Sequence, residues 1–220
     1  MRGTEITISV QDAHLRGELS LSDEVSGLVV FAHGSGSSRH SPRNQFVART
    51  LREAGVGTLL FDLMTAEEEQ AETNTRHLRF DIPFLAGRLV AATQWALDEG
   101  TTRDISVGYF GSSTGAAAAL VAAAELPENT NVVVSRGGRP DLAGVALERV
   151  RASTLLIVGG KDTAVISLNE EAYGRLQCEK ALRIVPGATH LFEEPGTLET
   201  VARMASEWFA DHFQPMGKAR

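Results

Sequence analysis

Residues 109–126 read YFGSSTGAAAALVAAAEL. An apolar run over residues 105–110 stops at Gly111, and an alanine-rich run with helical character begins just after Ser113. The pattern predicts a strand, a sharp turn and a helix, with Ser113 at the centre of a G-x-S-x-G turn. Such a turn forces the serine into a strained conformation that exposes its hydroxyl, and the helix that follows directs free N–H groups towards it. The pentapeptide alone is equally consistent with a turn whose small residues serve only packing.

Composition restricts the classes of function. The chain has 220 residues, of which 43% are hydrophobic, and a net charge of −7. We expect one domain over residues 1–220, with residues 214–220 as a frayed tail. The negative charge and the lack of a Lys/Arg cluster argue against a nucleic-acid partner. No signal peptide or membrane-length apolar run is evident, and a single cysteine excludes an internal disulfide, so we expect a cytoplasmic location without membrane association.

The order of patterns along the chain predicts an α/β protein. Residues 5–10 and 15–21 alternate apolar and polar side chains, which is typical of an antiparallel hairpin at a sheet edge. Buried strands are predicted over residues 27–35, 57–64, 105–110, 131–135, 154–160 and 181–187, and helices over 42–55, 84–100, 114–126, 142–150, 167–176 and 198–213. This alternation predicts a mostly parallel sheet with helices on both faces. The acidic stretch over residues 64–81 shows only a weak helical pattern, and we interpret it as a long exposed excursion.

Three polar residues follow candidate strand ends, where the functional residues of a parallel sheet gather. They are Ser113, Asp162 and His190, in the chain order nucleophile, acid, histidine that α/β-hydrolases use. A serine hydroxyl is a weak nucleophile near neutral pH, so it needs an imidazole to remove its proton and a carboxylate to orient that imidazole. Asp162 has an alternative interpretation as a helix cap, and Asp141 is the alternative acid.

A second loop is predicted to complete an oxyanion hole. His33 to Gly36 follow the first buried parallel strand, and the tetrahedral intermediate of acyl transfer needs two fixed donors. We assign these donors to the backbone N–H groups of Ser35 and Thr114, and expect His33 to orient the loop. The segment GSGSS lacks the Gly-Lys-Ser/Thr ending of a phosphate-binding loop. No metal or other cofactor is expected.

The chain resembles a small α/β-hydrolase of the dienelactone-hydrolase-like group. The resemblance rests on FAHGSGSSRHSPRN, LLFDLMTAEEE, GYFGSSTGAAAAL, VVSRGGRPDLAG, LLIVGGKD and PGATHLF, which together extend along nearly the whole chain. It implies an eight-stranded-type sheet and a triad that falls on Ser113, Asp162 and His190. Typical dienelactone hydrolases use cysteine as nucleophile, whereas the nucleophile position here is serine and Cys178 is expected on a remote helix. This departure favours ordinary ester hydrolysis over dienelactone cleavage.

The expected substrate is a small carboxylic ester with a short acyl chain. Residues 134–140 connect a strand to the next helix directly, so there is no room for the cap that covers long acyl chains in larger relatives. Arg136 and Arg139 lie on this connection and are predicted to favour substrates that carry a carboxylate; the alternative is that they pair with local acids. Thioester or lactone hydrolysis on the same triad and a non-catalytic binding role remain as alternatives, and homo-oligomerisation is left open.

Overall fold

The computed structural model describes residues 3–10, 13–22, 25–75, 77–103 and 105–213. The expected tail at residues 214–220 therefore lies outside the described residues. Within them, eight strands form one sheet in the order β1-β2-β4-β3-β5-β6-β7-β8. The strands are β1 (Thr4–Val10), β2 (Ala13–Ser20), β3 (Leu28–Ala32), β4 (Gly57–Phe61), β5 (Val107–Ser112), β6 (Thr130–Arg136), β7 (Ser153–Gly159) and β8 (Lys180–Val185).

The sheet is parallel from β4 through β8, as the buried apolar runs predicted. The β1–β2 and β2–β4 pairs are antiparallel, which confirms the edge hairpin. Every residue of β3, β4 and β5 is buried, because both faces of these strands are covered by helices. An α/β-hydrolase fold is thereby confirmed.

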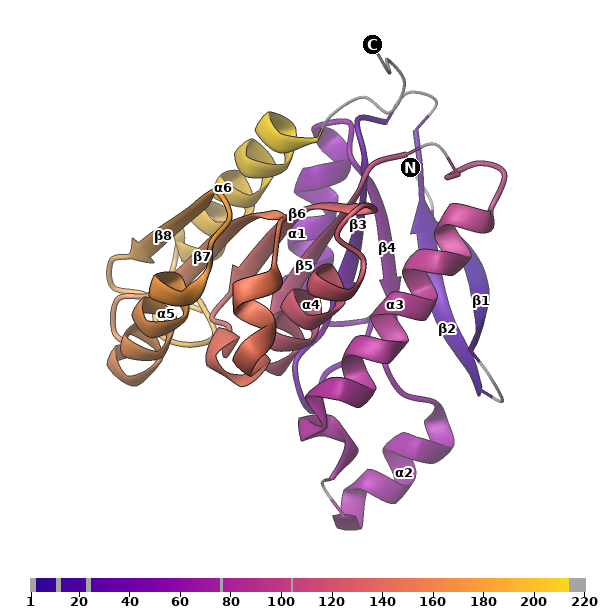
Figure 1. The fold of residues 1–220 in the computed structure, drawn as a ribbon, viewed down its shortest axis with the longest axis horizontal. Coiled ribbons are helices and arrows are strands. Elements are labelled where there is room, and N and C mark those ends of the chain that lie inside the picture. Colours follow the sequence, from indigo (N-terminus) through magenta and orange to yellow (C-terminus); the bar gives the residue numbers. More distant parts are fainter. Residues whose placement is uncertain (1–2, 11–12, 23–24, 76, 104, 214–220) are drawn as a thin grey trace.

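Helices cover the sheet on both faces (Figure 1). They are α1 (Pro42–Glu53), α2 (Ala66–Thr75), α3 (Ile82–Asp98), α4 (Thr114–Glu125), α5 (Thr163–Arg175) and α6 (Thr197–His212), with 3₁₀ helices η1 (Leu78–Phe80) and η2 (Pro140–Arg149). One face carries α3, α4, η2 and α5, and the other carries α1 and α6, so the core is divided into two clusters by the sheet. The alanine run of α4 is buried almost throughout, because small side chains let this helix lie close to the strands.

Two segments differ from the sequence-based expectation. The acidic excursion is helical over α2, whose start is stabilised by a capping box: Thr65 N–H donates to the Glu68 carboxylate at 2.8 Å, and Glu68 N–H donates to Thr65 Oγ1 at 3.2 Å. The helix predicted over residues 142–150 is instead 3₁₀ and is interrupted at Gly144, whose φ of 54° ends regular helix.

The connection from β6 to η2 is short, since β6 ends at Arg136 and η2 begins at Pro140. The predicted absence of a cap at this position is confirmed. No helix within the described part of the chain combines the length and the apolar character that crossing a bilayer requires.

Candidate active site

The turn after β5 holds Ser113 in an unusual backbone conformation. Its φ is 53° and its ψ is −124°, and it immediately precedes the first residue of α4. The flanking glycines are required by packing, because a Cβ on Gly115 would overlap the Ala32 carbonyl oxygen and lie 2.5 Å from the His33 oxygen. A strained serine that persists at a strand-to-helix turn indicates a functional position, since the strain costs about 1–3 kcal/mol.

Asp162 and His190 are brought together across the ends of β7 and β8. His190 Nδ1 lies 2.6 Å from Asp162 Oδ2, although the two residues are 28 positions apart. Asp162 occupies the N-cap position of α5, but its side chain makes no capping hydrogen bond. The Asp162 carboxylate therefore binds the imidazole of His190 and does not cap α5.

The alternative acid, Asp141, is engaged elsewhere. Both of its carboxylate oxygens accept hydrogen bonds from Arg139, at 2.9 and 2.8 Å. This pair is the local interaction that the sequence left open for Arg139, and Arg139 is not among the residues that line the cavity at Ser113. Hydrogen bonding to Asp141 also raises the pKa of Arg139.

A cavity of about 240 Å³ joins Ser113 to His190. Its lining comes from the loop after β3, the start of α1, the two strand ends at Ser113 and Arg136, and the loop that carries His190. The lining residues are Gly34, Ser35, Ser37, Ser41, Arg43, Ser112, Ser113, Arg136, Gly137, His190 and Leu191. Most of these residues are small or polar, and Leu191 contributes the one large apolar side chain of the lining.

Arg136 is the last residue of β6, where it pairs with Ser112 in the neighbouring strand, rather than a residue of the loop beyond. Its backbone oxygen accepts from Ser113 N–H at 3.4 Å. Burial and, to a smaller extent, the positive charge of Arg43 together lower the pKa of Arg136 to about 10. Sequence reasoning overlooked Arg43; its position at the start of the helix after the His33–Gly36 loop was the available signal.

The loop proposed for the oxyanion hole is held at its start by His33. His33 is buried, its Nδ1 lies 3.0 Å from the Gly34 oxygen, and its Nε2 accepts from Leu63 N–H at 3.1 Å. Burial lowers the pKa of His33, which keeps the ring neutral with its proton on Nδ1. His33 thus orients the loop, as expected.

The two predicted oxyanion donors are connected to each other. Ser35 N–H donates to Thr114 Oγ1 at 3.0 Å. This hydrogen bond holds the loop against the first residue of α4, and it means that the Ser35 donor has a protein acceptor. An oxyanion would have to replace the Thr114 hydroxyl as that acceptor.

Cys178 lies far from these residues along the fold. It is found in the segment between α5 and β8, not on a helix as expected, and thus at the amino end of β8 while His190 follows the carboxyl end. Its thiol is 3.6 Å from Thr154 Oγ1, and burial raises its pKa, which disfavours the reactive thiolate. Among the described residues, no group of three or more His, Cys, Asp or Glu is arranged to hold a metal ion.

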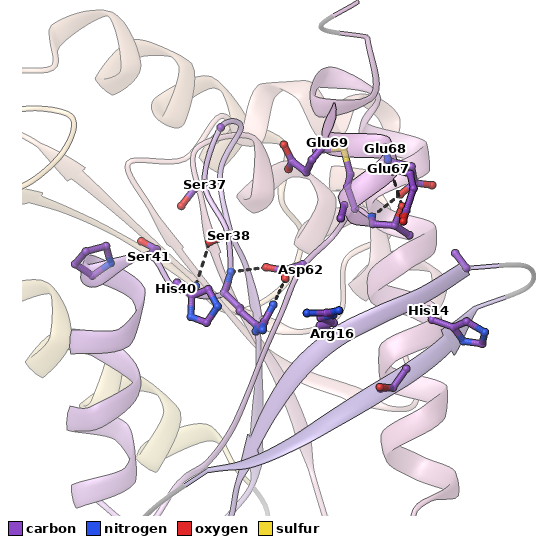
Figure 2. A pocket seen from close by; sticks show the side chains of 18 of the residues that line it. His14, Arg16, Ser37, Ser38, His40, Ser41, Asp62, Glu67, Glu68 and Glu69 are labelled. Atoms are coloured by element: carbon purple, nitrogen blue, oxygen red, sulfur yellow. Dashed lines mark hydrogen bonds and ion pairs between the residues drawn. The ribbon is translucent and has the colours of Figure 1, made fainter. Parts of the chain in front are cut away.

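A wider cleft adjoins the cavity (Figure 2). It measures about 1260 Å³ and lies between the β1–β2 hairpin, the loop after β3 and the start of α2. Ser37, Ser41 and Arg43 line both spaces, so the cavity at Ser113 opens towards this cleft. Phe80, in η1, is 55% exposed and lines neither space.

Comparison with solved structures identifies the family. The chain is 56% identical to a dienelactone hydrolase from Anabaena variabilis, over 97% of this chain and 100% of that one, with a TM-score of 0.95. The chain belongs to the dienelactone-hydrolase-like group of the α/β-hydrolases. The fold of this group extends to more distant proteins, such as Est1E from Butyrivibrio proteoclasticus, which is 16% identical over 94% of this chain and 98% of its own, with a TM-score of 0.78.

A curated relative of this dienelactone-hydrolase-like chain is longer. The chain is 53% identical over 212 residues to a Mycobacterium tuberculosis protein provisionally named a phosphoribosyl transferase. The match covers 96% of this chain and 47% of that protein, so the chain spans about half the length of the curated relatives it matches. No protein-family profile matches the chain.

Proposed function

We propose that this chain is a serine hydrolase that cleaves small, short-acyl carboxylic esters through an acyl-enzyme. The observation that carries the proposal is the strained Ser113, which shares a cavity with a His190 whose Nδ1 is 2.6 Å from Asp162. Because Nδ1 faces the carboxylate, Nε2 is the nitrogen left to act on the substrate side. The nucleophile, base and orienting acid of acyl transfer are then all assigned.

In the first half-reaction, His190 Nε2 removes the proton from Ser113 Oγ as that oxygen bonds to the ester carbonyl carbon. The carbonyl oxygen becomes an oxyanion, and the imidazolium is stabilised by Asp162. The bond from the carbon to the leaving oxygen then breaks, and the imidazolium returns its proton to the departing alcohol. In the second half-reaction, water replaces the alcohol, releases the carboxylic acid and restores the Ser113 hydroxyl.

Two backbone donors stabilise the oxyanion in this scheme. Thr114 N–H lies at the positive end of α4, and Ser35 N–H faces it from the loop that His33 holds. The substrate oxygen takes the position of Thr114 Oγ1 as acceptor for Ser35. The Thr114 hydroxyl thereby keeps the loop in place until substrate binds.

Substrate size follows from the walls of the site. A cavity of about 240 Å³ is too small to enclose a long alkyl chain, and the adjoining cleft leaves anything longer in solvent. Each methylene contributes about 0.8 kcal/mol only when it is buried. Short acyl groups are therefore favoured over lipid-length ones.

The same residues would serve thioesters and lactones, and the name of the Anabaena variabilis relative makes lactones the second substrate class to test. Phosphoribosyl transfer is less favoured, because the chain spans only 47% of the relative that carries that name and its site is built around a serine nucleophile. A non-catalytic binding role is less favoured, because such a role does not require the Asp162–His190 contact.

The test is labelling and turnover of paired serine variants. Ser113→Ala should lower kcat on p-nitrophenyl acetate by several orders of magnitude and abolish labelling by a fluorophosphonate probe. The neighbouring Ser112→Ala is the matched control and should still be labelled. Labelling of Ser112 or Ser35 in the wild-type protein, with Ser113 untouched, would show that the nucleophile is misassigned.

A further inference from the structure

The cavity at Ser113 contains a buried cation that has no partner. Arg136 is 6% exposed, its Nε is buried without an acceptor, and no hydrogen bond or ion pair joins its guanidinium to another described residue. Its one aromatic contact is with Phe192, whose ring centroid lies 5.9 Å from the guanidinium carbon. A buried charge without a partner is costly, so its retention indicates a ligand that supplies the missing acceptors.

A second cation lies beside the first. Arg43 lines the same cavity, and its charge lowers the pKa of Arg136, so the two guanidiniums repel each other. Glu193 pairs with Arg43 through Nη1 at 3.1 Å, but this carboxylate is largely exposed, and the Arg43 Nε has no acceptor. The exposed pair is screened by water and compensates only part of the charge.

The start of α1 adds to the positive potential. Ser41 caps this 12-residue helix, both Ser41 and Arg43 line the cavity, and the first turn contains no acidic residue. The positive end of a helix dipole favours an anion. The lining of the cavity contains no Asp or Glu, so nothing in its wall opposes a negative ligand.

We propose that Arg136 and Arg43 form an anion subsite beside Ser113 and that the substrate is a small acyl ester carrying a phosphate group. This inference rests on the proposed ester hydrolysis and specifies its substrate class. A single carboxylate would satisfy one guanidinium. A phosphate monoester carries a charge of nearly −2 and three peripheral oxygens, which match two forked donors and the neighbouring serine hydroxyls.

The position of Arg136 makes it a specificity-determining residue. It pairs with Ser112 at the strand end, and its backbone oxygen accepts from Ser113 N–H, so its guanidinium is held on the same rigid strand pair that carries the nucleophile. The substrate's acyl carbonyl and its phosphate must therefore be separated by only a few bonds, as the cavity of about 240 Å³ also requires.

The kinetic test uses three acetyl esters that differ only in the terminal group: 2-acetoxyethyl phosphate, 3-acetoxypropanoate and 2-acetoxyethanol. The wild-type kcat/KM should be about 10- to 100-fold higher for the phosphate than for the alcohol, because charge-assisted hydrogen bonds to two guanidiniums add to binding. The carboxylate should fall between them. Equal kcat/KM values for all three esters would overturn the subsite, and a carboxylate equal to or better than the phosphate would overturn the phosphate assignment.

Arginine variants locate the preference. In Arg136→Met the ratio of the phosphate to the alcohol kcat/KM should fall to near one, and Arg136→Lys should retain part of it, because lysine keeps the charge but not the fork. Arg139→Met is the matched control: this arginine is three residues further on, pairs with Asp141 and lies outside the cavity lining. A ratio that falls equally in Arg139→Met would mean that general electrostatic attraction, and not the subsite, sets the preference.

A binding measurement separates this inference from the proposed function. Inorganic phosphate should raise the Tm of wild-type protein and of Ser113→Ala, and should not raise that of Arg136→Met, at matched ionic strength with NaCl as reference. If none of the three esters is hydrolysed, the proposed ester hydrolysis fails while an Arg136-dependent shift in Tm still supports the anion subsite. If the esters are hydrolysed and phosphate shifts no Tm, the subsite fails while the hydrolase stands.

Discussion

Arg136→Met should stabilise the protein, which is an unusual result for the replacement of a buried residue. The pKa of Arg136 is about 10, which is between two and three units below that of a solvated guanidinium. That difference corresponds to about 3 kcal/mol of cost for burying the charge. Methionine retains the apolar contacts of the side-chain stem, so removal of the charge should release most of this cost.

The stabilising interactions that Arg136→Met removes are weaker than this cost. The guanidinium carbon of Arg136 lies 5.9 Å from the centroid of the Phe192 ring, and such a contact contributes about 0.5–1 kcal/mol. No ion pair or hydrogen bond to a described residue is broken. The net increase in the free energy of unfolding should therefore be about 2 kcal/mol, which raises the Tm by about 4–8 °C for a chain of this size.

The pH dependence has a definite sign. The folded-state pKa is lower than the unfolded-state one, so below about pH 10 both states carry the proton and the wild-type protein bears the full cost. Above pH 10 the folded protein releases the proton while the unfolded chain keeps it, and the cost shrinks. The stability advantage of Arg136→Met should be constant from pH 6 to 9 and decrease above pH 10.

Urea unfolding measures the difference in the free energy of unfolding between the wild-type protein and Arg136→Met, with the midpoints compared at an unchanged m-value. Arg139→Met is the control; it breaks a partly exposed pair and should change stability by no more than about 1 kcal/mol, in the destabilising direction. A destabilisation of Arg136→Met by 1 kcal/mol or more would refute the reasoning, because it would show that the guanidinium has structural partners that compensate its charge.

Three further predictions concern the triad, the substrate and the turn. Asp162→Asn should lower kcat by about 10³- to 10⁴-fold with little change in Tm, since the carboxylate orients His190 and caps no helix, whereas Asp141→Asn, which loses only its contact with Arg139, should retain activity in the same p-nitrophenyl acetate assay. Across p-nitrophenyl esters, kcat/KM should be highest from acetate to butyrate, and a rise that continues to decanoate would contradict the small cavity of about 240 Å³. Gly115→Ala should destabilise the protein by at least about 2 kcal/mol in urea unfolding, because its Cβ would overlap the Ala32 carbonyl oxygen, while Gly87→Ala, at an exposed position of α3 where an added Cβ meets no atom within 4 Å, is the control for helix propensity alone.

Most of the fold was predictable because its strands are buried on both faces. Strands such as residues 28–32 and 57–61 appear in the sequence as continuous apolar runs, because both of their faces are buried. Turn residues separate these runs from the amphipathic helices. The helix α2 was not predicted with the same clarity. Its sequence has no apolar stripe at helical spacing. The helix is stabilised instead by the Thr65–Glu68 capping box and by the ion pair of Glu68 with Arg88 at 2.6 Å.

The order of the elements and the three polar residues at strand ends can be read from local patterns. Periodicity and turn chemistry are local, so Ser113 could be placed at its turn and Asp162 and His190 at the ends of strands without coordinates. Which charges have partners depends on the folded chain. Arg136 and Arg139 look alike in the sequence, three residues apart, yet Arg139 reaches Asp141 whereas Arg136 is buried near Arg43 with no acceptor among the described residues. Whether a charge is solvated, paired or left for a ligand depends on residues that are distant in the chain and become neighbours only when the sheet assembles.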